Sequence, residues 1–193
     1  VSNIPDCDDT NAILACLDAT TTAVDLDGRN AGITGTGLFE PTGEMFDCNA
    51  SGTTMRFVAA LAALTSEPIT LTGTPRLMQR PMEGLNAALE ALGKQVDERG
   101  DYRVISGRPV IPAAVRVDAS KSGQFVSGLL MALAACGSPT TVRALQPASR
   151  PFITMTIAVM RSFGASVDVN EDGDELVFTL DGAGYQATNF TVE

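Results

Sequence analysis

Two glycines and one arginine in this chain have surroundings suited to holding an anion. Gly52 in S-G-T and Gly123 in S-G-Q each stand directly before a helical pattern. Free backbone N–H groups and the positive end of the helix dipole would therefore face a bound phosphate or carboxylate. Arg80 precedes a proline, whose fixed φ would pre-organise a guanidinium fork for the same ligands. Taken alone, each pattern is more often a capped turn or a solvated surface arginine.

The composition restricts what such sites can do. The 193 residues include 13 basic and 23 acidic side chains, a formal net charge of −10, which disfavours binding to nucleic acid or to anionic membranes. An anionic ligand must therefore be held locally. Histidine is absent, which excludes imidazole general bases, His-ligated zinc and Ser-His or Cys-His nucleophile pairs.

The cysteines and the chain ends favour a cytoplasmic location. The four cysteines form no C-x-x-C pair and are too few for a disulfide scaffold, so we expect reduced thiols. No stretch reaches 18 apolar residues, and the acidic start VSNIPDCDDT is not a signal peptide. That start also lacks an initiator methionine, which suggests an excised piece.

An internal repeat organises the chain. The S-G-x turn and the helical pattern after it recur from position 51 to position 122, an offset of 71 residues. Arg80-Pro81 is echoed by Arg150-Pro151 at nearly the same offset, and Gly93 after a helical pattern is echoed by Gly164. Several matched landmarks in the same order indicate two copies of one structural unit.

Periodicity predicts the order βαβαββ within each unit. We expect helices over 53–64 and 82–92 in the first copy, and over 123–135 and 152–163 in the second. The expected strands are PITLTG, KQVDER, YRVISG, VIPAAVRVD, TTVRAL, ASVDVN and ELVFTL, the last two joined by a hairpin turn over 171–174. Helices 53–64 and 123–135 carry small residues on all sides, which predicts that they are the innermost helices.

The first fifty residues fit only the second half of such a unit. We expect a strand in VSNIP, a helix capped by Asp8-Asp9-Thr10 and running to Leu17, and strands in AVDLDG and NAGITG. The S-G-x turn and its helix have no counterpart here. One half-unit is thus expected to be missing at the N-terminus, to be supplied from elsewhere or lost by truncation.

Four ordered motifs, NASGTTMRF, LTGTPRLMQRPMEGL, SKSGQFVSGLLMAL and SRPFITMTIAVMRSFGA, carry a family resemblance across essentially the whole chain. The sequence resembles the shikimate-3-phosphate-binding domain of the 5-enolpyruvylshikimate-3-phosphate synthase family. The resemblance implies an α/β fold of repeated βαβαββ units around a pseudo-threefold axis, the inside-out α/β barrel of enolpyruvate transferases. It also implies that residues 1–193 form one of the two domains of the full enzyme.

The family transfers the carboxyvinyl group of phosphoenolpyruvate to the 5-hydroxyl of shikimate 3-phosphate, in the pathway to chorismate and aromatic amino acids. The resemblance implies these two small molecules and the second domain as partners, and no cofactor. The family's catalytic residues lie in the absent domain, so we expect none in this chain. Alone, it should bind shikimate 3-phosphate weakly, bind phosphoenolpyruvate hardly at all, and be inactive.

The resemblance also implies the residues that bind the substrates. For shikimate 3-phosphate they are Ser122, Gly123, Gln124, Ser149 and Phe152, and for phosphoenolpyruvate they are Gly52, Arg80 and Gln124. This chain departs from the family where Gly123 replaces a second serine and Phe152 replaces a residue with a ring hydroxyl. Arg56 is expected to be a structural partner of carboxylates or backbone carbonyls. Because the S-G-x and R-P turns lie at the same end of their helices, Ser122, Gln124 and Ser149 should share one pocket.

Two related enzymes and a non-catalytic module of the same fold are the alternatives. UDP-N-acetylglucosamine 1-carboxyvinyltransferase would have a reactive cysteine near the R-P turn, and LTGTPRLMQRPM contains none. RNA 3′-phosphate cyclase would need a catalytic histidine, which the chain lacks. Binding of shikimate 3-phosphate would separate a synthase domain from a non-catalytic module.

Overall fold

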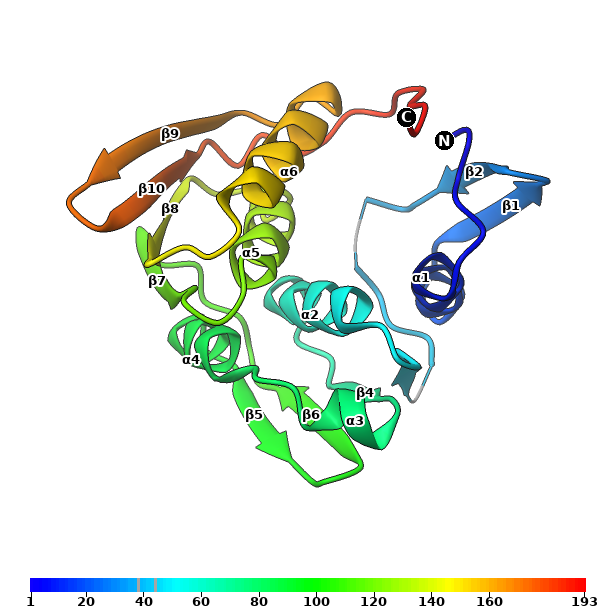
Figure 1. The fold of residues 1–193 in the computed structure, drawn as a ribbon, viewed down its shortest axis with the longest axis horizontal. Helices are drawn as coiled ribbons and strands as arrows, with labels where there is room; N and C mark the ends of the chain where they lie inside the picture. The colour runs from blue at the N-terminus through cyan, green and yellow to red at the C-terminus, as the bar shows by residue number, and fades with distance from the viewer. Residues whose placement is uncertain (38, 44) are drawn as a thin grey trace.

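Figure 1 shows the computed structural model of the chain, which describes residues 1–37, 39–43 and 45–193. Two units of the same topology follow one another. The first contains β3 (Phe46–Asp47), α2 (Gly52–Leu61), a 3-10 turn η1 (Ala62–Leu64), β4 (Ile69–Thr72), α3 (Pro75–Met78), α4 (Glu83–Ala91), β5 (Gln95–Glu98) and β6 (Tyr102–Ser106). The second contains β7 (Ala114–Asp118), α5 (Gln124–Ala134), β8 (Thr140–Leu145), α6 (Arg150–Ser162), β9 (Val167–Asp172) and β10 (Glu175–Leu180).

The sheets confirm the predicted βαβαββ repeat. The first unit has the strand order β3-β4-β6-β5, and the second has the matching order β7-β8-β10-β9. In both sheets the first pair is parallel and the other two pairs are antiparallel. The parallel pair is joined by α2 or α5, the helix crossover that a parallel connection needs.

The N-terminal part differs from prediction in two details. It contains α1 (Asp8–Asp18) and an antiparallel pair, β1 (Ala23–Asp27) and β2 (Asn30–Thr34). The expected strand VSNIP is wrong, because residues 1–5 form no strand and contribute only an isolated bridge from Ser2 to Thr191. The expected cap is also wrong, because Cys7 is the N-cap residue. The carboxylates of Asp8 and Asp9 lie in the first turn, where their negative charges interact favourably with the positive end of the helix dipole.

The turn predicted over 171–174 is shorter in the structure. Strand β9 continues to Asp172 and β10 begins at Glu175, so only Gly173 and Asp174 connect them. Gly173 has a φ of 61°, which suits a residue without a side chain in a two-residue connection.

Helices α2 and α5 form the centre of the fold, as their composition predicts. Nine of the eleven residues of α5 and seven of the ten residues of α2 are buried. Their first turns are in contact, because Nε2 of Gln124 at the start of α5 donates to Oγ1 of Thr53 in the first turn of α2 at 2.8 Å. Their packing therefore holds the S-G-x turns in fixed positions. None of the helices in the described part of the chain is long and apolar enough to cross a bilayer.

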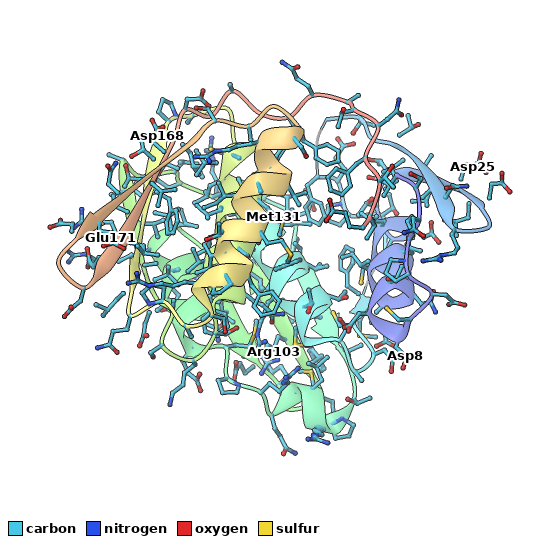
Figure 2. The ribbon with its side chains drawn as sticks, turned by 45° about the horizontal axis from the view of Figure 1, so that its top comes forward. Asp8, Asp25, Arg103, Met131, Asp168 and Glu171 are labelled. Carbon is cyan, nitrogen blue, oxygen red and sulfur yellow. The ribbon has the colours of Figure 1, made fainter. Side chains whose placement is uncertain are left out.

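Tyr185 ties the irregular C-terminal segment to α5. Its hydroxyl donates a hydrogen bond of 2.9 Å to the carbonyl of Met131, a residue of α5 that Figure 2 labels beside α6. Partial burial raises the pKa of Tyr185 to about 12, from an ordinary value near 10, although 40% of its surface is exposed. The neutral phenol is thus favoured in the folded state.

We therefore expect an alkaline loss of stability that depends on Tyr185. Its contribution is complete below about pH 10 and is lost as the pH rises toward about 12, because only the unfolded chain ionises readily in that range. Urea unfolding at several pH values measures this. Tyr185→Phe should give a flatter dependence than the wild type, and identical curves would contradict the assignment.

Candidate functional site

A cavity of about 750 Å³ opens where α2, α5 and α6 meet. It is lined by six of the seven predicted site residues: Arg80, Ser122, Gly123, Gln124, Ser149 and Phe152. The prediction that Ser122, Gln124 and Ser149 share one pocket is confirmed. The seventh residue, Gly52, adjoins the cavity through its contact with the side chain of Arg80.

Gln124 is held in one orientation by the first turns of α2. Arg56 donates from Nη1 to Oε1 of Gln124 at 2.5 Å, and Gln124 donates from Nε2 to Oγ1 of Thr53 at 2.8 Å. The amide oxygen is therefore occupied by a guanidinium. The second N–H of Gln124 and the hydroxyl hydrogen of Thr53 remain as donors for a ligand that accepts hydrogen bonds.

Gly52 makes room for two guanidinium groups. A Cβ atom added to Gly52 would lie 2.3 Å from Nη1 of Arg80 and 3.4 Å from Nη1 of Arg56. Burial lowers the pKa of Arg56, and the charges of Arg80 and Arg103 lower it further. Among residues 1–37, 39–43 and 45–193, no carboxylate forms an ion pair with Arg56 or Arg80. Two neighbouring cations without a counter-ion would be stabilised by a bound anion.

The serines at this site have hydroxyl hydrogens to donate. Oγ of Ser122 accepts the backbone N–H of Gln124 at 3.2 Å in the turn before α5, which leaves the hydroxyl hydrogen available. Ser149 is the N-cap residue of α6, but its side chain makes no capping hydrogen bond. Its backbone is left-handed, with φ 55° and ψ 45°, a conformation that costs free energy in a residue other than glycine.

The structure gives a steric reason for glycine at position 123. A Cβ atom there would lie 2.4 Å from the carbonyl oxygen of Ala148. A serine side chain cannot occupy this position unless the backbone before α6 moves. The glycine in S-G-Q thus allows the loop before α5 to approach the loop before α6 closely. This approach brings Gly123 and Ser149 to the same cavity.

Two basic residues of the cavity, Arg56 and Lys121, were not predicted as site residues. Arg56 was expected to bind carboxylates or carbonyls; it does donate to the carbonyl of Pro81 at 3.4 Å, but its shorter hydrogen bond is to Gln124. Arg56 is also 93% buried, since only 7% of its surface is exposed, and its guanidinium lies over the ring of Phe125. One sequence feature could have indicated a site role for Arg56: it is the only charged residue in the stretch 52–64.

The lining of this cavity contains no acidic side chain from residues 1–37, 39–43 and 45–193. Figure 2 shows Asp8 and Asp25 on one side of the molecule, and Asp168 and Glu171 on the hairpin at the opposite side. The cavity is therefore locally basic, with Arg56, Arg80 and Lys121, although the whole chain carries a net charge of −10.

Comparison with known proteins assigns the chain to a family. The family model described as EPSP synthase (3-phosphoshikimate 1-carboxyvinyltransferase) matches residues 1–193. The chain belongs to the EPSP synthase family. It is 40% identical over 158 residues to the 3-phosphoshikimate 1-carboxyvinyltransferase of Thermococcus kodakarensis, and 37% identical over 164 residues to that of Mycobacterium ulcerans. These alignments include 80% and 83% of the chain, which spans only 39% and 38% of the two relatives.

Solved structures confirm the fold expected for an EPSP synthase domain. An EPSP synthase from Acinetobacter baumannii superposes with a TM-score of 0.79 at 23% identity, over 99% of this chain and 43% of the other. The enolpyruvyl transferase NikO from Streptomyces tendae gives a TM-score of 0.58 at 16% identity, over 95% of this chain and 43% of the other. The repeated α/β architecture is thus shared with enolpyruvyl transferases.

Proposed function

We propose that this EPSP synthase chain is the shikimate-3-phosphate-binding part of a 3-phosphoshikimate 1-carboxyvinyltransferase. The observation that carries the proposal is the meeting of Ser122, Gln124 and Ser149 in one basic cavity beside Arg80. The complete enzyme would transfer the carboxyvinyl group of phosphoenolpyruvate to the 5-hydroxyl of shikimate 3-phosphate and release phosphate.

The phosphate of shikimate 3-phosphate would be held without a direct ion pair. The hydroxyls of Ser122 and Ser149 donate to its oxygens, together with the backbone N–H groups at the start of α5, where the helix dipole favours negative charge. Phe152, whose surface is 64% exposed, would give the carbocycle an apolar wall.

Phosphoenolpyruvate would lie toward Arg80, beside Gly52. The guanidinium of Arg80 and the free N–H of Gln124 are the donors for its phosphate, and the absence of a Cβ at Gly52 keeps Arg80 in place. Among the residues that the structure describes, no carboxylate lines the cavity to act as an acid or a base there. We infer that the proton-transferring groups, and the further cations that phosphoenolpyruvate needs, come from a second domain that closes over this face.

Titration of the isotope-labelled chain with shikimate 3-phosphate tests the proposal. We expect weak binding with NMR shift changes at Gly123, Gln124 and Ser149. Ser122→Ala and Gln124→Ala should each weaken binding by about 10-fold or more, because a hydrogen bond to a charged group contributes about 1.5 to 3 kcal/mol. Phosphoenolpyruvate should cause little change.

Ser162→Ala is the matched control, since Ser162 is exposed at the far end of α6 and donates only to the carbonyl of Val159. It should leave the binding unchanged. Shift changes that avoid the cavity would contradict the substrate assignment. Release of phosphate when the chain alone is mixed with both substrates would contradict the need for a second domain.

A further inference from the structure

Arg103 occupies a position of β6 that faces the core. Its surface is only 4% exposed, and the other buried residue of β6 is Ile105. The matching strand of the second unit, β10, buries Leu176, Phe178 and Leu180. The first unit thus carries a guanidinium, labelled in Figure 2, on a strand face that is apolar in the second. Because burying a charge is costly, the partners of this group should indicate what it does.

The guanidinium of Arg103 joins three elements. Its Nη2 donates to the carbonyl of Met78, at the end of α3, at 2.7 Å. Its Nε donates to Oε1 of Glu98 on β5 at 2.9 Å, and its Nη1 donates to Sδ of Met55 on α2 at 3.1 Å. The side chain of Glu98 is 53% exposed, so water weakens that ion pair. The hydrogen bond to Met78 is the shortest of the three and the one that reaches the R-P turn.

Helix α3 depends on such contacts for its position. It has only four residues, and a single helical turn is not stable by itself in water. At its start, the N–H of Thr74 donates to the carbonyl of Asn49 at 2.7 Å. At its end, Arg103 binds the carbonyl of Met78, one of the last carbonyls of a helix, which lack partners within it. Arg103 thus fixes the end of α3.

The end of α3 determines where Arg80 lies. The N–H of Arg80 donates to the carbonyl of Leu77 at 3.0 Å, so Arg80 follows directly from that turn. Its guanidinium is packed against Gly52, where an added Cβ atom would lie only 2.3 Å from Nη1. A shift of α3 would therefore change the place of Arg80 at the cavity.

The second unit provides an internal comparison. The arginine of its R-P turn is Arg150, which forms an ion pair with Glu171 at 3.0 Å while both side chains are more than half exposed. The arginine of the first R-P turn, Arg80, lines the cavity instead. The buried strand arginine, Arg103, thus occurs in the unit whose R-P arginine faces the candidate site.

We propose that Arg103 is a positioning residue for Arg80. It holds the end of α3, so that the guanidinium of Arg80 is already in place at the cavity before an anion binds. This inference rests on the proposed function, because Arg80 is assigned there as a donor to the phosphate of phosphoenolpyruvate. An arginine that is ordered in advance loses less conformational freedom on binding than a mobile one, which favours the bound state.

NMR of the Nε–H group of Arg80 in the ligand-free chain tests the proposal, with Arg80→Lys to assign the signal. In the wild type, its heteronuclear NOE should be well above that of the exposed Arg108. In Arg103→Met, which has a similar length but no donor, it should fall to the level of Arg108. The weak response of Arg80 to concentrated phosphoenolpyruvate should then need about 2- to 10-fold more ligand.

Three further variants separate positioning from general support of the fold. Glu98→Gln keeps an acceptor for Nε of Arg103 and should leave the Arg80 signal unchanged. Ile105→Val removes one buried carbon from the same strand, which lowers stability but spares the hydrogen bond to Met78. It should also leave the signal unchanged. Arg103→Lys keeps the charge and a donor but not the planar fork, so it should give an intermediate NOE.

An ordered Arg80 in Arg103→Met would overturn the proposal, as would an equal loss of order in Ile105→Val. If Arg103→Met does not fold, as seen by circular dichroism, Arg103→Lys is compared with Ile105→Val in the same way. Shikimate 3-phosphate distinguishes the two proposals. If it causes no shifts at the cavity of the wild type, the proposed function fails, while the ligand-free order of Arg80 still tests the role of Arg103.

Discussion

Gly84→Ala should lower the free energy of unfolding by about 2 to 3 kcal/mol, the range of a severe overpacking substitution. A Cβ atom at Gly84 would lie 2.1 Å from the carbonyl oxygen of Asp118 and 3.2 Å from Cδ2 of Phe125. The nearer atom belongs to the backbone of the second unit and cannot rotate away. The methyl group must therefore push α4 off β7, although alanine favours a helix over glycine by about 1 kcal/mol.

Urea unfolding followed by circular dichroism measures this loss. Gly32→Ala is the matched control, because the nearest atoms to a Cβ at Gly32 are 3.9 Å away and its backbone is not left-handed. It should change the free energy of unfolding by less than about 0.5 kcal/mol. Equal stability of the two variants would show that α4 does not need its close approach to β7.

Arg56→Met should separate binding from stability. The methionine removes a buried cation that has no carboxylate partner among the described residues and that lies near Arg80 and Arg103. Relief of desolvation and repulsion offsets the lost hydrogen bonds, so we expect a change in unfolding free energy of about 1 kcal/mol or less. The affinity for shikimate 3-phosphate should nevertheless fall about 10- to 100-fold, because Gln124 loses the group that orients its amide.

Calorimetric titration and urea unfolding of the same samples test both halves of this prediction. Arg108→Met is the control, since Arg108 is exposed outside the cavity and its loss changes the net charge equally. It should leave the affinity within about 2-fold, given screening of distant charges by salt. Parallel losses of stability and affinity in Arg56→Met would indicate that Arg56 only supports the fold.

Sequence patterns predicted the repeated units because the determinants of their elements are local. The S-G-x and R-P turns, the helical periodicity and the glycines after α4 and α6 all act within a few residues. Elements that depend on distant partners were missed. Strand β3 is only two residues long and exists through its pairing with β4. The four-residue α3 was also not anticipated, although its N-cap Thr74 and the proline that follows it are local signals.

The candidate site shows the same limit. Ser122, Gln124 and Ser149 were placed correctly because repeat symmetry puts their helix starts on one side. The hydrogen bond from Arg56 to Gln124 joins residues 68 positions apart, and no local pattern encodes it. The approach of Ala148 to Gly123 is equally invisible without the packing of the loops before α5 and α6.

The contact of α4 with β7 has a thermodynamic consequence. Helix α4 belongs to the first unit by sequence, yet it covers the leading strand of the second, while α2 packs along α5. Each unit would therefore expose apolar surface if the other unfolded, so the interfacial free energy is lost from both at once. The two units, which together span residues 46–180, should unfold in one cooperative transition. The calorimetric and van't Hoff enthalpies of that transition should then agree.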